Sequence, residues 1–321
     1  MTRPPFIVCI GGACVDRTYR AHAPLAPATS NPVSAAAAGF GGVARNVAEN
    51  LARLNVSAGL VSSIGADEPG RALSSHLGTL GVTTRLTVAD GRRTAEYVAV
   101  LQPSGGLAFG LADMEIFETL TPRLIDEVWP LLSGADGVLA DCNLPGDTLA
   151  HLIGRCREPS AFKLAVDAVS ISKARRLPSD LAGVDLLFAN LDEACAIVGA
   201  DPMARSPEDL ARSILDRGAG AFVLTLGERG VLAAQPGGAI TTLPAVAADV
   251  VDVTGAGDAL IAGTLSRVID GAPLVEALRT GLVAAALAIE TGGSVRLDLS
   301  PGLIRTAARR AQAVSDPEEA Q

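Results

Sequence analysis

The sequence is poor in lysine, histidine and aromatic residues. Its 321 residues include two lysines, three histidines and 3% aromatic residues, and no lysine follows a glycine. The P-loop of many ATPases needs a Gly-Lys pair before Ser or Thr, so this class is excluded. Basic residues form no run, and the net charge is −9 at pH 7. These features argue against binding to nucleic acid or to an anionic membrane and favour a small-molecule substrate.

The five cysteines and three histidines are scattered, with no C-x-x-C pair. Neither a zinc site nor a disulfide framework is therefore expected, and free thiols fit a cytoplasmic protein. The apolar stretch from Phe6 to Val15 is too short and too rich in glycine for a signal peptide, so it predicts a first buried strand. The most apolar helical segment, 281–289, is too short to span a bilayer.

Short apolar runs alternate with amphipathic segments along most of the chain. Continuous apolar strands separated by helices predict a doubly wound α/β fold, with a mainly parallel sheet and helices on both faces. No linker divides the chain, so residues 1–321 are expected to form a single domain. The expected strands lie near 6–12, 136–141, 163–169, 185–190 and 221–227, and the expected helices near 43–54, 68–80, 121–132, 146–156, 206–217, 257–270 and 273–289.

Two segments interrupt this alternation. Residues 17–40 are rich in alanine and proline, and residues 94–112 contain two short strand patterns around the turn PSGG. We expect these segments to form a small β-sheet outside the main one, which would act as a lid. The edges of such a sheet can pair with the lid of a second copy, so a homodimer through the lid is also expected.

The stretch DVTGAGDAL, residues 252–260, places two glycines and an aspartate before an apolar run. A helix that begins near Gly255 presents unpaired N–H groups and the positive end of its dipole, which together attract anions. Asp258 would stand beside a bound phosphate and take a proton from an alcohol that attacks it. From this stretch alone, an ordinary turn with an acidic helix cap is an equal alternative.

The segment 39–50, GFGGVARNVAEN, contains a loose G-x-G-x-x-A match to the dinucleotide-binding fingerprint. That fingerprint follows a strand directly, and the preceding SAAAA is a poor strand, so a nicotinamide site is disfavoured. Asn46 falls in the first turn of the next helix, where its amide suits sugar hydroxyls. Asn50, four residues later, is expected to be solvated.

Ligands of open parallel sheets bind beyond the carboxyl ends of the strands. Polar residues follow several expected strands at this edge, and their coincidence indicates a shared site. They are Asp16, Asn143, Asn190, Asp192, Glu193, Thr225 and Gly227.

Five motifs occur in an order that resembles the ribokinase (PfkB) family of sugar and nucleoside kinases: GGVARNVAENLARL, SSIGADEPG, NLDEA, TLGERG and DVTGAGD. The resemblance extends from Phe6 to about Arg309. Segments at 30–54, 111–114, 140–145 and 169–173 are most similar to members that phosphorylate pseudouridine. The resemblance implies ATP-dependent phosphorylation of the 5′-hydroxyl of pseudouridine. The alternatives are a kinase for ribose or another nucleoside and, less favoured, a non-catalytic nucleoside-binding sensor.

The resemblance also implies a role for each site residue. Asp258 would be the base, and the N–H groups of Gly255, Ala256 and Gly257 would form an anion hole for the γ-phosphate. The substrate would be held by Asp16, Gly42, Asn46 and Asn143, with Asn31 reaching it from the lid.

For the nucleotide and its cations, the resemblance implies a second group of residues. Glu193 would hold Mg²⁺, partly through water, and the backbone carbonyls of Asp252 and Thr254 would hold a monovalent cation such as K⁺. The ATP site would be lined by Asn190, Glu193, Thr225, Gly227 and Gly230.

The sequence departs from the family pattern at two places. Related sequences carry an asparagine that touches the sugar where this one has Cys14, and a thiol is a weak hydrogen-bonding group. Gln102, Pro103 and Gly106 replace an acidic pattern in the lid. Lys173 is open to two interpretations, a residue that faces the substrate or a surface lysine.

Overall fold

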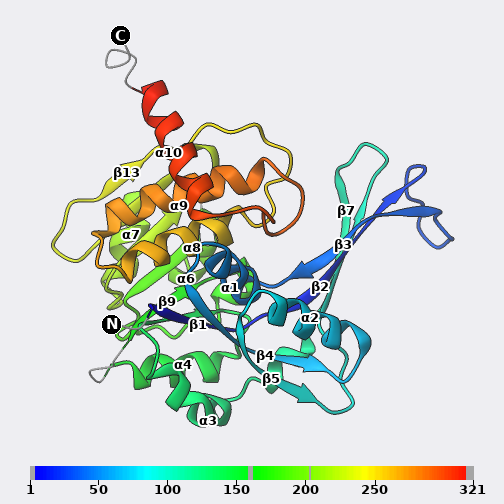
Figure 1. Cartoon of the computed structure of the whole chain (residues 1–321), viewed down its shortest axis with the longest axis horizontal. Coiled ribbons are helices and arrows are strands. Elements are labelled where there is room, and N and C mark those ends of the chain that lie inside the picture. The colour runs from blue at the N-terminus through cyan, green and yellow to red at the C-terminus, as the bar shows by residue number, and fades with distance from the viewer. Residues whose placement is uncertain (1–3, 158–161, 202–203, 316–321) are drawn as a thin grey trace.

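A mainly parallel sheet forms the centre of the computed structural model, which describes residues 4–157, 162–201 and 204–315 (Figure 1). Within these residues the main sheet has nine strands in the order β13-β12-β11-β10-β9-β8-β1-β4-β5. The pairs β11–β12 and β12–β13 are antiparallel, and the remaining pairs are parallel. The strands are β1 Phe6–Ile10, β4 Ser57–Gly65, β5 Thr83–Ala89, β8 Gly137–Asp141, β9 Lys163–Asp167, β10 Leu186–Asn190, β11 Phe222–Thr225, β12 Val231–Ala234 and β13 Thr241–Leu243.

Helices cover both faces of this sheet, which confirms the predicted doubly wound class. Apolar side chains of α3, α4, α6 and α7 pack in one core cluster, and those of α1, α2, α8 and α9 pack in the other. The α-helices are α1 Val43–Arg53, α2 Glu68–Thr79, α3 Pro122–Leu132, α4 Gly146–Arg155, α5 Ile171–Ala174, α6 Leu191–Val198, α7 Pro207–Leu215, α8 Ala256–Val268, α9 Leu274–Ile289 and α10 Pro301–Ser315, with short 3-10 helices η1 Glu115–Thr119 and η2 Gly227–Arg229. None of the described helices is long and apolar enough to cross a bilayer.

A second sheet projects from one side of the molecule (Figure 1). We call it the lid sheet; its strands are β2 Cys14–Ala21, β3 Val33–Gly41, β6 Glu96–Leu101 and β7 Leu107–Asp113, in the order β3-β2-β6-β7. Leu107, Phe109 and Leu111 alternate along β7 and are 57–60% exposed. The lid sheet therefore presents an apolar stripe to its surroundings.

The first strand expected near 6–12 is present as β1 and ends at Ile10, because the chain leaves the main sheet at Gly11 and Gly12 and enters β2. The expectation that SAAAA is a poor strand is wrong. Residues 34–38, SAAAA, do form a strand as part of β3. That strand pairs antiparallel with β2 in the lid sheet, whereas a dinucleotide fingerprint needs a strand of the main parallel sheet.

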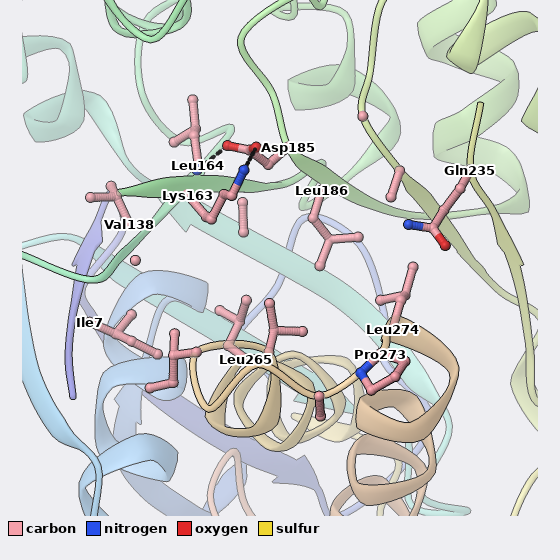
Figure 2. Close-up of a pocket in the computed structure, with 17 residues that line it drawn as sticks. Ile7, Val138, Lys163, Leu164, Asp185, Leu186, Gln235, Leu265, Pro273 and Leu274 are labelled. Carbon is pink, nitrogen blue, oxygen red and sulfur yellow. Dashed lines mark hydrogen bonds and ion pairs between the residues drawn. The ribbon is translucent and has the colours of Figure 1, made fainter. Parts of the chain in front are cut away.

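A cavity of about 390 Å³ opens at the amino ends of β1, β8, β9, β10 and β11 (Figure 2). Its lining is mostly apolar and includes Ile7, Leu186 and, from α8, Leu265. Lys163 and Asp185 form an ion pair of 2.9 Å at this cavity. The polar residues predicted for the site follow the opposite, carboxyl ends of the strands, so this cavity is separate from the candidate site.

Candidate active site

Asp258 is buried in the first turn of α8 and contacts α1. Its Oδ2 accepts a hydrogen bond of 2.7 Å from Nδ2 of Asn46, a residue 212 positions away in the sequence. Gly255, which precedes the helix, has φ 77, and a Cβ at this position would lie 2.0 Å from the carbonyl oxygen of Ser294. Only glycine fits this tight approach. The structure thus brings together two residues that were predicted separately.

The surroundings of Asp258 change its acidity. Burial raises the pKa of its carboxyl to about 7, while the hydrogen bond from Asn46 and the charge of Arg45 oppose this rise. The charges of Asp141 and Asp16 add to it. A carboxylate whose pKa lies near neutral pH can hold a proton taken from an alcohol and release it afterwards.

The first turn of α8 offers backbone donors beside Asp258. Among the described residues, no acceptor contacts the N–H groups of Gly255 and Gly257. The N–H of Ala256, which was expected to be equally free, donates to the carbonyl oxygen of Val253 over a long 3.3 Å. Unpaired donors at the positive end of a helix dipole form a local environment that stabilises negative charge.

Asp16 lies within β2 of the lid sheet, and not in a loop after β1 as the sequence suggested. Its carboxylate accepts hydrogen bonds from the Ser294 hydroxyl at 3.2 Å and from the Cys14 thiol at 3.4 Å. Burial raises the pKa of Asp16, and these two bonds oppose the rise. Cys14, the departure from the family pattern, thus contacts a residue predicted to hold the ribose.

Asp141 is a buried residue of this site that the sequence analysis missed. Its Oδ2 accepts hydrogen bonds of 2.9 Å from the backbone N–H groups of Gly12 and Ala44, and its Oδ1 accepts one of 2.9 Å from that of Asn143. It therefore joins the end of β8 to the β1–β2 connection and to the start of α1. Its position as the last residue of a predicted strand is the sequence signal that indicates a place at the carboxyl edge of the sheet.

Gly42 lies at the junction that Asp141 holds. It has φ 93, and a Cβ there would lie 2.4 Å from the carbonyl oxygen of Gly12. The side chain of Asn143 lies at the same junction, because a Cβ on Gly12 would lie 2.5 Å from its Nδ2.

Arg45 and Glu49 form a buried ion pair that contacts Asn46 and that the sequence did not predict. The Arg45 guanidinium donates to Oδ1 of Asn46 and to Glu49, the latter at 2.6 Å. Both side chains of this pair are at most 3% exposed. Glu49 also contacts Arg53 at 2.6 Å and His76 at 2.8 Å. A single acid at helical spacing from two arginines looks like a surface pattern in the sequence, so only packing reveals its burial.

Two asparagines lie differently from the expectation. The side chain of Asn31 bonds the backbone N–H and carbonyl of Ala26 at 2.8 Å each, so it closes its own loop and contacts no other candidate site residue. Asn50 was expected to be solvated, but it is 1% exposed, and neither polar atom of its side chain has a partner within the described structure. Packing of α1 against α8 accounts for its burial.

The residues predicted for the nucleotide follow two adjacent strands. Asn190 ends β10 and caps α6: its Oδ1 accepts from the N–H of Glu193 at 2.9 Å, and Oε2 of Glu193 accepts from the N–H of Asn190 at 2.9 Å. Thr225 pairs with Asn190 in the sheet register. Gly227 begins η2 and Gly230 follows it, with φ 61 and 88. The structure therefore places these five residues together at the carboxyl edge.

The described residues contain no group of three or more His, Cys, Asp or Glu side chains arranged to hold a metal ion. Burial raises the pKa of Glu193. At the other predicted cation site, the Asp252 carboxylate accepts from the N–H of Thr254 at 2.9 Å. The carbonyl oxygens of Asp252 and Thr254 accept no hydrogen bond from the described residues, which fits an oxygen-bound monovalent cation.

The site thus pairs a buried carboxylate and free helix N–H groups with two flanking sets of polar residues. This arrangement defines the class as a kinase for a small hydroxylated substrate. Residues 4–299 match the pfkB family carbohydrate kinase, and the chain belongs to this family. It is a kinase of the sugar and nucleoside kinase group, and the family assignment inferred from the motifs is confirmed.

Relatives and solved structures agree with this assignment. Pseudouridine kinase of Escherichia coli (strain K12) is 30% identical over 304 residues, covering 94% of this chain and 95% of that protein. Pseudouridine kinase of Arabidopsis thaliana is 26% identical over 329 residues, covering 82% and 86%. A carbohydrate kinase from Agrobacterium tumefaciens superposes with a TM-score of 0.82 at 33% identity, covering 95% and 97%. Arabidopsis thaliana ribokinase in complex with ribose and ATP has a TM-score of 0.81 at 20% identity, covering 96% and 99%, and shows the shared fold.

Proposed function

We propose that this kinase transfers the γ-phosphate of ATP to the 5′-hydroxyl of pseudouridine. The observation that carries the proposal is the contact between Asn46 and Asp258 at the positive end of α8. This contact joins a base of suitable pKa to a residue proposed to hold the ribose, which supports the proposal. The named relatives in Escherichia coli and Arabidopsis thaliana favour pseudouridine as the acceptor.

The acceptor binds first through its ribose in this proposal. Asp16, Asn46 and the Gly42 backbone contact the sugar hydroxyls, and Asn143 reaches the base. Asp258 takes the proton of the 5′-hydroxyl while its oxygen attacks the γ-phosphorus. The N–H groups of Gly255 and Gly257, with that of Ala256 once it leaves Val253, stabilise the charge that builds up on the phosphoryl oxygens.

The nucleotide occupies the edge formed by Asn190, Glu193, Thr225, Gly227 and Gly230. Glu193 would hold Mg²⁺ through water, and the ion would supply positive charge to the ATP phosphates. The carbonyl groups of Asp252 and Thr254 would hold K⁺, which would fix the loop before α8.

The lid sheet closes over the acceptor and excludes water, so that ATP is not hydrolysed. The exposed stripe on β7 supports a homodimer in which two lid sheets meet. The proposal includes a cytoplasmic location, in which the thiols of the five cysteines would stay reduced.

Ribose or another nucleoside is the second candidate acceptor. The Cys14 thiol donates to Asp16 and gives the sugar a weaker partner than the asparagine of related sequences would, so the acceptor of this chain can differ from theirs. The loop that Asn31 closes would also have to open for a lid contact with a base.

The test is ADP release with Mg-ATP and K⁺, comparing pseudouridine, uridine, ribose and no acceptor. Turnover with pseudouridine alone, lost in Asp258→Asn, is the expected result. Turnover with ribose or uridine alone overturns the choice of acceptor and leaves the mechanism standing. Binding of these acceptors without turnover by any of them would instead indicate a sensor.

A further inference from the structure

The turn after β9 lies at the carboxyl edge of the main sheet, between the acceptor side and the nucleotide side of the candidate site. β9 pairs with β8 on one side and with β10 on the other, and Asp167 lies opposite both Asp141 and Phe188 in the register. Residues after β8 belong to the predicted acceptor side, and residues after β10 belong to the nucleotide side. A side chain on the turn after β9 is therefore near the path of the phosphoryl group.

This turn has an unusual backbone. Val169 has φ 67, a left-handed conformation that is a rare outlier for a β-branched residue. Its N–H donates to Oδ1 of Asp167 at 2.9 Å, and the N–H of Ser170 donates to the carbonyl oxygen of Ala168 at 2.8 Å. Ser170 then caps α5. Strain of this kind is retained where the surroundings require one conformation. The Ser170 side chain accepts from the N–H of Lys173, so this turn leads directly into the segment that carries Lys173.

Lys173 is half-buried, yet its ammonium has no hydrogen-bond or ion-pair partner among the described residues. The neighbouring Arg176 differs, since its guanidinium is used by the carbonyl oxygens of Asn143 and Leu144 and by Glu118. Arg45, another cation at this edge, is paired with Glu49, and Arg229 of η2 is exposed. Lys173 is thus a half-buried cation at this edge whose ammonium is available to a ligand.

The charges around Lys173 place it next to the site. Burial lowers the pKa of its ammonium, the charge of Arg176 lowers it further, and the charges of Glu118 and Asp141 oppose this. Several carboxyl groups share this edge, including those of Asp141, Asp167 and Asp258. A triphosphate brought to such an acidic edge needs cationic partners.

We propose that Lys173 is a catalytic residue that contacts the phosphoryl group during transfer, from the side away from the first turn of α8. This inference rests on the proposed kinase mechanism. In the step, the bond from the acceptor oxygen to the γ-phosphorus forms, and the bond from that phosphorus to the β–γ bridging oxygen breaks. The acceptor proton passes to Asp258, and ADP leaves with the electron pair. Lys173 keeps its proton and stabilises the charge on the transferring oxygens.

The first test compares Lys173→Met and Lys173→Arg with Lys163→Met. Lys163 begins β9 and Lys173 follows the carboxyl end of β9, so the two lysines lie at opposite edges of the main sheet. The side chain of Lys163 is 74% exposed and forms its ion pair at the distant cavity (Figure 2). We expect Lys173→Met to lower kcat by about 100-fold or more, with the acceptor KM changed less than about threefold. Lys173→Arg should recover about tenfold of that loss, and Lys163→Met should retain wild-type kcat. Equal melting temperatures exclude a merely structural effect.

The second test needs no turnover, because the chain has only two lysines. Reductive methylation with ¹³C-formaldehyde gives separate NMR signals for Lys163, Lys173 and the α-amine, which the two lysine variants assign. The β,γ-imido analogue of ATP with Mg²⁺ should shift the Lys173 signal and leave that of Lys163 in place. Mg-ADP, which lacks the γ-phosphate, should shift it much less.

The outcomes separate this inference from the proposed function. Wild-type turnover with kcat of Lys173→Met within about threefold of it would overturn the role of Lys173 alone. Equal NMR shifts with ADP and the imido analogue, or a shift caused by pseudouridine alone, would also overturn it. Absence of wild-type turnover with every acceptor would count against the proposed function, whereas the NMR result would still decide whether Lys173 meets the γ-phosphate.

Discussion

Nδ2 of Asn46 lies 2.7 Å from Oδ2 of Asp258, which links the start of α1 to the start of α8. Since Arg45 donates to the other side of the same amide, the orientation of Asn46 is fixed with its NH₂ toward the carboxylate. The amide therefore favours the ionised form of Asp258, the form that accepts a proton. In the proposed mechanism, Asn46 therefore connects sugar binding with the protonation state of Asp258.

Replacing Asn46 by alanine should make Asp258 a base only at higher pH. The lost hydrogen bond is worth about 1 kcal/mol, so the acid limb of the kcat/KM profile should move up by roughly 0.5–1 pH unit from its wild-type position near 7. The pH–rate profile measures this directly. Asn50→Ala is the matched control on the same helix, since Asn50 has no side-chain partner within the described structure. An unmoved limb in Asn46→Ala would contradict the link.

Asp258→Asn should abolish transfer and stabilise the fold above neutral pH. The pKa of Asp258 is raised by burial from 3.8 to about 7, so its contribution to stability is present below about pH 4 and is lost as pH rises to 7. At pH 8 the variant should be more stable by roughly 2–4 kcal/mol, while at pH 4 the two proteins should be nearly equal. Urea unfolding at both pH values tests this. If the variant is instead less stable than the wild type at pH 8, the ionised Asp258 carboxylate does not destabilise the fold, and the prediction is contradicted.

Glu49→Gln should destabilise the protein strongly, because it leaves Arg45 buried without its partner. The expected cost is about 3–5 kcal/mol. Arg123 and Glu127 form a matched pair, with the same residue types, the same i,i+4 spacing and a distance of 2.8 Å, but with side chains 87% and 56% exposed. Glu127→Gln should cost less than about 1 kcal/mol. Similar losses in the two variants, measured by urea unfolding, would contradict the importance of burial.

The sequence predicted the fold class well because the signals were local. Seven amphipathic segments became helices at the expected places, since each carries an apolar face of its own. The additional elements lacked such a signal. Two serines interrupt the apolar pattern of β4, although Ser62 and Ser63 are fully buried, and α6 follows β10 without a spacer.

The site was less predictable because its partners are distant in the chain. Glycine and acidic motifs predicted Asp258 and Asn190, but nothing local says that Asp141 binds three backbone N–H groups from three segments. The same holds for Asn50, which helical spacing puts one turn after Asn46 and which packing buries. Burial of polar residues depends on which helices meet, and this is decided by the tertiary fold.

Phe109→Glu should separate the proposed homodimer into monomers. Phe109 lies between Leu107 and Leu111 on the exposed stripe of β7, and a carboxylate there cannot be buried against the same stripe of a second copy without a large cost. The control is Val88→Glu, since Val88 is 52% exposed on β5, an edge strand of the main sheet, outside the lid sheet. Light scattering after gel filtration should give twice the chain mass of 32.5 kDa for the wild type and for Val88→Glu, and the single mass for Phe109→Glu. A wild-type monomer, or a dimer that survives Phe109→Glu, would contradict a dimer contact through this stripe.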